Sequence, residues 1–228
     1  ELDKNKFLKN SDLINFFSSH KNDYIICMKT IQNLVMLHKL GTKSILLETL
    51  KKIGLKSPIL CSKPQIMINS KLTSSNVGHW MMPVHQDWRS MQGSLNSVVV
   101  WLPLIDCPED LGALKIIRGS HKNGLLPSET DVWYAHVKDE YVKDEKFESV
   151  PMKKGDVLIF STFLLHKSGE NITNDFRISA QFRFNDLYES TYVKRKYFNP
   201  YPSNPPQNGL FTSNFPTSDD MKNVFKND

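Results

Sequence analysis

Two short segments of the chain hold side chains of the types that bind iron. His85 and Asp87 stand two positions apart within 83–88, and His166 follows the apolar run 157–163. Residues i and i+2 of a strand point to the same face, so we expect the imidazole of His85 and the carboxylate of Asp87 to converge. Two histidines and one carboxylate form the facial triad, which leaves open positions on Fe(II) for a bidentate cosubstrate and O2. The sequence therefore predicts a metal centre built from His85, Asp87 and His166.

Arg177 follows His166 by eleven positions, and its side chain is of the type that binds a carboxylate. The intervening residues 169–174 are polar and favour a turn, so a hairpin centred there would set Arg177 opposite His166. Cross-strand partners point to the same face of a sheet, so we expect both side chains in one pocket. Arginine binds a carboxylate through two charge-assisted hydrogen bonds. Ser168 would add a hydroxyl group to the same carboxylate.

The strand predicted after this hairpin alternates polar and apolar side chains, so one of its faces is polar. In an ordinary strand the polar face meets water. For Arg183 this alternative stays open, whereas His166 and Ser168 favour a pocket around Arg177. The polar residues are Arg177, Ser179, Gln181 and Arg183, and the apolar ones are Ile178, Ala180, Phe182 and Phe184.

Helical periodicity dominates the first 60 residues. The spacing of apolar residues predicts helices over 11–17 and 24–40. A third helix is predicted to begin at a Thr42 cap, to run through Leu50 and to end at Gly54. We expect these helices to cover a sheet.

Short strands separated by turns follow over 61–190. Because no helices alternate with them, the pattern predicts a mainly β fold with flanking helices, an antiparallel sandwich or jelly roll. Residues 191–228, rich in Asn, Pro and Ser, are predicted to form an extended tail, and 1–228 a single domain. The expected strands are 65–69, 97–104, 113–117, 157–163 and 176–184.

Composition excludes several classes of protein. With 39% hydrophobic and 23% charged residues, the 228-residue chain reads as a soluble globular protein, without the ~18 consecutive apolar residues of a membrane helix. The net charge of +5 is spread along the chain, which favours a solvated basic face over a nucleic-acid surface. Three cysteines without a C-x-x-C motif favour a reducing compartment, and no signal peptide is visible, so we expect a cytoplasmic protein.

The order of several short motifs resembles the phytanoyl-CoA dioxygenase family of Fe(II)- and 2-oxoglutarate-dependent oxygenases. The resemblance covers about residues 64–186. No single motif is specific, but the combination is. The motifs are the H-x-D of His85 and Asp87, Trp101-Leu102-Pro103-Leu104, Gly112-Ala113-Leu114, Ile117-Arg118-Gly119-Ser120-His121-Lys122, Lys154-Gly155-Asp156, His166-x-Ser168 and Arg177.

The resemblance implies a double-stranded β-helix, the cupin-type jelly roll, and a hydroxylase that uses Fe(II), 2-oxoglutarate and O2 and releases succinate and CO2. Halogenating relatives lack the metal-binding carboxylate, so its presence in this chain favours hydroxylation. The roles implied are iron binding for His85, Asp87 and His166, binding of the distal carboxylate of 2-oxoglutarate for Arg177 and Ser168, and lining of the cosubstrate pocket for Gln86 and Trp101.

The sequence leaves the substrate open. Trp88, Arg89 and Arg183 are candidate substrate contacts, and the two arginines would suit a small molecule that bears a carboxylate or phosphate. A macromolecule-modifying oxygenase is one alternative, which the basic composition permits. A non-catalytic jelly-roll binding module is another, although an unused buried cluster of charges would be costly to keep.

Overall fold

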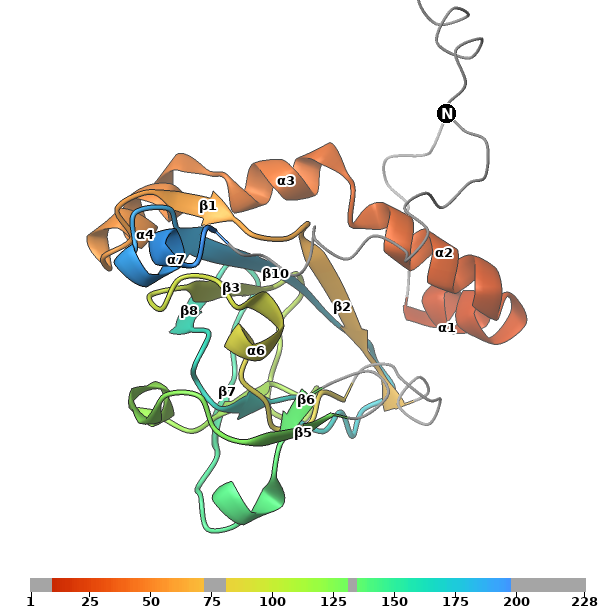
Figure 1. The fold of residues 1–228 in the computed structure, drawn as a ribbon. Coiled ribbons are helices and arrows are strands. Elements are labelled where there is room, and N and C mark those ends of the chain that lie inside the picture. The colour runs from red at the N-terminus through yellow and green to blue at the C-terminus, as the bar shows by residue number, and fades with distance from the viewer. Residues whose placement is uncertain (1–9, 72–80, 131–134, 198–228) are drawn as a thin grey trace, which may run out of the picture.

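The computed structural model describes residues 10–71, 81–130 and 135–197 of the chain. Figure 1 shows the N-terminal helices along one side of a sheet and the strands β5, β6 and β7 on its other side. Within the described residues every helix is too short or too polar to span a bilayer. The N-terminal helices are α1 (Asn10–Ser19), α2 (Lys21–Ile31), α3 (Val35–Gly41) and α4 (Ser44–Lys52).

The predicted helix over 24–40 is two helices, because the chain turns between α2 and α3. The amide of Asn33 bonds back to the carbonyl of Thr30 at 2.9 Å, and asparagine favours such turns over a helix interior. The turn lets α3 bury Leu37 and Gly41. A Cβ atom at Gly41 would lie 2.4 Å from the Phe182 ring, so only glycine permits this close approach of α3 to the sheet.

The ends of α4 confirm one predicted boundary and correct the other. Thr42 does not cap α4, because its hydroxyl donates to the carbonyl of His38 at 2.9 Å and so ends α3. At the other end Gly54 has φ +113°, and the amide of Leu55 reaches the carbonyl of Leu50 at 3.1 Å. This left-handed glycine with a bond back across the last turn ends the helix as predicted.

The largest sheet among the described residues has five antiparallel strands, in the order β1-β10-β3-β8, with β2 also paired to β10. A second sheet has the order β7-β4-β9, and β5 pairs with β6 alone. All five predicted strands are present, with ends shifted by about two residues at most. The bounds are β1 (Pro58–Leu60), β2 (Gln65–Asn69), β3 (Val98–Pro103), β4 (Leu114–Ile116), β5 (Ser128–Thr130), β6 (Ala135–Val137), β7 (Glu148–Val150), β8 (Leu158–Ser161), β9 (His166–Lys167) and β10 (Arg177–Asp186).

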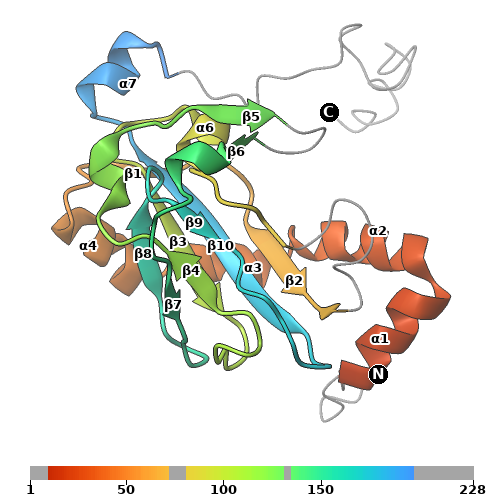
Figure 2. The same ribbon diagram turned by 90° about the horizontal axis from the view of Figure 1, so that it is seen from below.

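Two apolar clusters separate three layers (Figure 2). The first cluster joins Leu46 and Leu50 of α4 to Val100 and Phe182 of the five-stranded sheet. The second lies between the two sheets. It includes Val99, Trp101, Phe160, Leu114 and Ile116. Of the predicted helical region, α3 and α4 therefore cover one face of the large sheet, and the smaller sheet covers the other.

Short helices complete the described part of the chain. The segment predicted as an extended tail begins within α7 (Ser190–Lys194), because the Glu189 carboxylate accepts the amide hydrogens of Thr191 and Tyr192 and so caps a helix there. The rest of that segment, from residue 198, lies outside the described residues. The other short helices are α6 (Trp88–Met91) and the 3₁₀ turns η1 (Ser120–Asn123) and η2 (Asp139–Tyr141).

Candidate active site

His85, Asp87 and His166 meet in the wall of one cavity. Each is buried, and their ligand atoms all lie within 4.8 Å of one another. His85 and His166 form an antiparallel bridge, with backbone hydrogen bonds of 3.0 and 3.3 Å in the two directions. The prediction that these three side chains converge on one point is therefore confirmed.

The predicted reason for that convergence is wrong. His85 and Asp87 do not share the face of a strand, because Asp87 has helical φ −62° and ψ −27° and stands at the N-terminus of α6. The next amide, Trp88, donates to the carbonyl of Thr162 at 3.0 Å and anchors the start of this helix to the loop before His166. The change from extended to helical backbone between the two residues aims both side chains at one point.

Backbone carbonyls fix the orientation of both imidazoles. Nδ1 of His85 lies 2.7 Å from the carbonyl of Pro83, and Nδ1 of His166 lies 2.9 Å from that of Leu164. A carbonyl only accepts, so Nδ1 carries the hydrogen in both rings and Nε2 keeps its lone pair. Each lone pair then faces the site that the two rings share with Asp87.

The spacing of the donor atoms suits a metal ion. Nε2 of His85 is 3.7 Å from Oδ1 of Asp87, and Nε2 of His166 is 3.9 Å from its Oδ2. Both distances are too long for hydrogen bonds, so the imidazoles do not satisfy the carboxylate. Oδ2 is buried and accepts no hydrogen bond. The three residues therefore fit a divalent metal.

The electrostatics put these ligands in the protonation states that a metal needs. Burial lowers the pKa of His85, and burial together with the neighbouring His85 lowers the pKa of His166 from 6.5 to about 3. Burial alone would raise the pKa of Asp87, but Arg183 and the two histidines hold it well below its usual value. Metal binding requires neutral imidazole and ionised carboxylate, which is the state found here.

The predicted hairpin between His166 and Arg177 is wrong. His166 pairs with Ile116 in the smaller sheet, whereas Arg177 pairs with Asn69 in the larger one. The connecting segment crosses between the sheets, because Asn171 bridges to Leu111 on one side and donates to the carbonyl of Asn69 on the other. His166 and Arg177 nevertheless line the same cavity, since the two sheets face each other.

Arg177 is a buried cation that pairs with no carboxylate among the described residues. Its side chain is 2% exposed, one Nη donates to the carbonyl of Gly112, and Nε has no hydrogen-bond partner. Among the described residues no carboxylate pairs with it, and burial lowers its pKa to about 10. A charge buried in this way costs free energy, so the arrangement suits an anionic ligand that supplies the missing acceptors.

The cavity encloses about 280 Å³. All the predicted site residues except Trp88 line it. Trp88 instead stacks on Phe163, with ring centroids 5.3 Å apart, so the structure does not bring it into the cavity wall. From the sequence, His79 and Trp80, which shortly precede the H-x-D motif, are candidates for substrate contacts as well, but they lie outside the described residues. The lining residues are Gln65, Met67, Met82, His85, Gln86, Asp87, Arg89, Ser90, Trp101, Leu114, Phe160, His166, Ser168, Arg177, Gln181 and Arg183.

Gln86, Trp101 and Ser168 line the cavity with different polar groups. The Gln86 carboxamide is fully engaged: its nitrogen donates to the carbonyls of Gly124 and Phe163, and its oxygen accepts from the Leu126 amide. The Trp101 indole nitrogen is buried and has no hydrogen-bond partner. Oγ of Ser168 accepts from the Met82 amide at 3.0 Å. Trp101 thus keeps a free donor, while Gln86 holds the loop around residues 124–126 in place.

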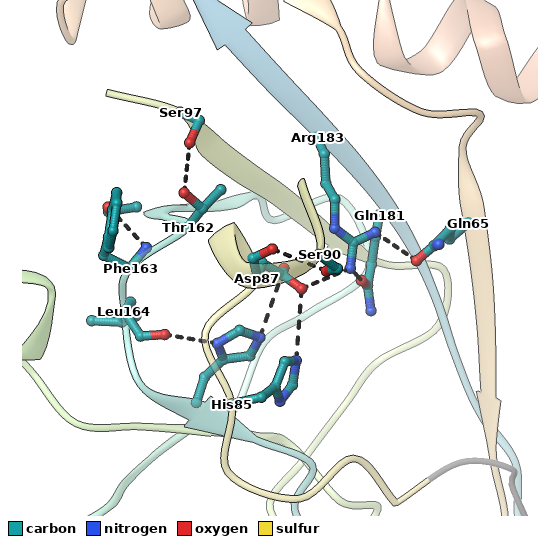
Figure 3. A network of polar contacts seen from close by, with 12 residues as sticks. Gln65, His85, Asp87, Ser90, Ser97, Thr162, Phe163, Leu164, Gln181 and Arg183 are labelled. Atoms are coloured by element: carbon teal, nitrogen blue, oxygen red, sulfur yellow. Dashed lines mark hydrogen bonds and ion pairs between the residues drawn. The ribbon is translucent and has the colours of Figure 1, made fainter. Parts of the chain in front are cut away.

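Arg183 contacts the metal-site carboxylate directly. One Nη donates to Oδ1 of Asp87 at 3.1 Å and to Oε1 of Gln181 at 3.2 Å, and the other donates to Oε1 of Gln65 at 2.5 Å. Figure 3 shows Asp87 between Arg183 and His85. Arg183 is 6% exposed, so the alternative of a water-facing position is wrong. Sequence reasoning missed Gln65 and Gln181, although the alternation of β10 placed Gln181 on the polar face.

Comparison with known proteins first places the fold. The chain superimposes on the epimerase SnoN, solved in complex with Fe3+, alpha ketoglutarate and nogalamycin RO, with a TM-score of 0.54 at 16% identity. The match covers 74% of this chain and 61% of SnoN. The architecture is therefore one in which a solved protein binds Fe3+ and a 2-oxo acid.

Sequence comparison then gives the family. The pattern that defines the phytanoyl-CoA dioxygenase family matches residues 10–179, and the chain belongs to this family. A 1-deoxypentalenic acid 11-beta-hydroxylase from Streptomyces exfoliatus is 32% identical over 102 residues, 41% of this chain and 36% of that enzyme. A methylphosphonate hydroxylase from Gimesia maris is 26% identical over 139 residues, 61% of this chain and 52% of that enzyme. The chain thus spans about a third to a half of the length of these relatives.

Proposed function

We propose that the protein is an Fe(II)- and 2-oxoglutarate-dependent dioxygenase that hydroxylates a small molecule and releases succinate and CO2. The observation that carries the proposal is the pairing of two features in one cavity. The first is a cluster of two neutral imidazoles and a carboxylate. The second is the buried Arg177, which has no carboxylate partner among the described residues. Membership of the phytanoyl-CoA dioxygenase family supports it.

In this proposal His85, Asp87 and His166 hold the iron. Three protein ligands leave open positions for the cosubstrate and O2. When bound, Fe(II) with 2-oxoglutarate and O2 would supply the oxidising chemistry that inserts one oxygen atom into a C–H bond and so hydroxylates it. The carbonyls of Pro83 and Leu164 keep both Nε2 atoms turned toward the ion. The carboxylate at position 87 supports hydroxylation over halogenation.

Arg177 and Ser168 bind the distal carboxylate of 2-oxoglutarate in this proposal. The Arg177 guanidinium keeps Nε unengaged, and a carboxylate accepts two of its hydrogens in parallel. Trp101 adds the free indole N–H as a further donor in the wall. Gln86 lines the pocket and acts through the loop that its carboxamide holds.

The finer structural predictions are part of the same proposal. We infer a double-stranded β-helix as the particular form of the two packed sheets and a single oxygenase domain over 1–228. The substrate is inferred to be anionic, since three arginines and one aspartate line the cavity. A cavity of about 280 Å³ supports a small molecule over a macromolecule. The cost of an unused buried Arg177 argues against a non-catalytic binding module.

The test is the visible charge-transfer band of the iron chelate. Metal-free protein is mixed with Fe(II) and 2-oxoglutarate without oxygen, alongside Arg177→Ala and His166→Ala. We expect a band in the native protein that both variants lose, His166→Ala with the metal and Arg177→Ala with the cosubstrate. A folded native protein that gives no band would refute the proposed function.

A further inference from the structure

Arg183 determines how two glutamines face the cavity. Its guanidinium donates to the carboxamide oxygen of Gln65 at 2.5 Å and to that of Gln181 at 3.2 Å. A guanidinium has only donors, so each carboxamide must turn its oxygen toward Arg183 and its NH2 group away. Figure 3 shows the Gln181 carboxamide with its oxygen on the Arg183 side and its nitrogen directed away from it.

The two NH2 groups are available for a ligand. Neither donates a hydrogen bond to a residue in the described part of the chain, and neither is a buried atom sealed from solvent. Gln65 and Gln181 both line the cavity that Asp87 shares. They therefore present two oriented donors in the cavity that holds the candidate metal centre.

The charge of the cavity favours an anion at these donors. Three guanidinium groups and one carboxylate line it, so positive charge is in excess. Iron(II) and the 2-oxoglutarate dianion carry opposite charges of equal size, so the excess persists when both are bound. Arg89 donates to the carbonyl of Leu126 at 2.7 Å and forms no ion pair within the described ranges.

We infer that Gln65 and Gln181, oriented by Arg183 and supported by the charge of Arg89, bind an oxyanion group of the substrate. The shared chemistry is that of a carboxylate or phosphonate, whose oxygens accept from both NH2 groups. Arg183 itself acts as a positioning residue, because its donors already serve Asp87 and the two glutamines. This inference rests on the proposed function, since it places the substrate relative to the iron and the cosubstrate.

The central variant is Gln181→Glu. Glutamate keeps the size of the side chain and its contact with Arg183, but it replaces the NH2 donor with a negatively charged oxygen. Gln181→Met removes the donor without adding charge and serves where the glutamate variant does not fold. Gln32→Glu is the matched control, because Gln32 lies at the end of α2, outside the cavity wall.

The probes are methylphosphonate, propionate and the neutral propionamide. Their binding is measured by saturation-transfer NMR on protein loaded with Zn(II) and saturating 2-oxoglutarate, which blocks Arg177. We expect both anions, or one of the two, to bind the native protein and the Gln32→Glu variant about tenfold or more tightly than propionamide. In Gln181→Glu we expect that binding to weaken about tenfold or more, with a smaller loss in Gln181→Met. Binding of one anion alone would identify the group as phosphonate or carboxylate.

Two outcomes would overturn the inference. One is that neither anion binds more tightly than propionamide to native protein that gives the iron chelate band. The other is undiminished anion binding by a folded Gln181→Glu variant. Loss of the band in the native protein would instead refute the proposed function, so the two failures are distinguishable. The band is recorded for Gln181→Glu as well, where we expect it to be retained because the metal ligands and Arg177 are unchanged.

Discussion

The two ends of the cavity hold arginines in opposite states. Arg177 and Arg183 lie on the same face of β10 and are 2% and 6% exposed. Arg183 donates to one carboxylate and two carboxamides. Arg177 donates only to the carbonyl of Gly112, and its Nε has no hydrogen-bond partner among the described residues. Two buried side chains of one type on one strand therefore serve different purposes.

The difference shows where each charge is balanced. Asp87 offsets the charge of Arg183 within the protein, and Arg183 in turn helps to hold the pKa of that carboxyl low. No carboxylate in the described part of the chain pairs with Arg177, whose pKa burial lowers to about 10. A buried cation that the fold leaves unbalanced is balanced by a ligand, and that contrast separates a structural arginine from a binding one.

The largest effect is expected for Arg183→Met, which leaves Asp87 buried without its partner. We expect the free energy of unfolding to fall by about 3–5 kcal/mol, as for other broken buried ion pairs. Urea unfolding of the metal-free protein measures it. Arg118→Met is the matched control, since its pair with Glu148 is exposed and we expect no measurable change. Equal stability of the Arg183→Met variant and the native protein would show that the pair of Arg183 with Asp87 does not stabilise the fold.

Arg177→Met should weaken ligand binding without lowering stability, which is the reverse of the effect expected for Arg183→Met. We expect the affinity for 2-oxoglutarate to fall by about 100-fold, since a buried charge-assisted pair is worth about 3 kcal/mol. The stability of the ligand-free chain should not fall, because the substitution removes an unbalanced buried charge. Titration calorimetry with 2-oxoglutarate and urea unfolding give the two numbers. A variant as unstable as Arg183→Met would contradict the assignment of Arg177 to a ligand.

The burial of the two metal-site histidines also makes stability depend on pH. Burial lowers the pKa of His85 and His166 in the folded chain, so the unfolded chain binds protons first as the pH falls below 6.5. Stability of the metal-free protein is therefore present above pH 6.5 and is lost toward pH 5, by about 1 kcal/mol per pH unit for each histidine. Unfolding midpoints at pH 7, 6 and 5 measure this slope. His166→Gln should reduce this slope. A flat profile for the native chain would show that the buried histidines are charged when folded.

The smallest effect is expected for Ser168→Ala at the Arg177 end. Loss of one hydroxyl should weaken 2-oxoglutarate binding by about 1 kcal/mol, roughly fivefold. The Ser168 hydroxyl also holds the Met82 amide, so the unfolding free energy is measured in parallel. An affinity unchanged from the native protein would leave Arg177 as the main anchor and remove Ser168 from the cosubstrate site.

Much of the fold could be predicted because its determinants are local. Alternation and turn residues placed β2 and β10 almost to the residue, and the left-handed Gly54 ended α4 as expected. The helix over 24–40 was mispredicted as one element, since apolar periodicity continues through a turn at Asn33 that packing on the sheet requires. Local patterns indicate that a helix or strand is present, but they do not indicate the direction in which the chain continues after it.

The hairpin between His166 and Arg177 failed for a related reason. A polar, turn-rich segment favours reversal, and the pattern does not say whether the chain returns to the same sheet. Asn171, which contacts Leu111 and Asn69, determines that it crosses to the other sheet. The prediction that His166 and Arg177 share a pocket is correct although the hairpin predicted to cause it is absent. Two sheets that face each other bring side chains together as well as neighbouring strands do.

The sequence by itself determined which side chains are available for chemistry: two histidines, an aspartate and an arginine with motif spacing. Only the tertiary structure decided which partners balance the charge of each side chain. Arg183 and Arg177 look alike along β10, yet one meets Asp87 and Gln65, the latter 118 positions away, and the other meets no carboxylate among the described residues. Charge balance depends on which groups lie within a few ångströms, and for residues far apart in the chain that is set by how the sheets pack.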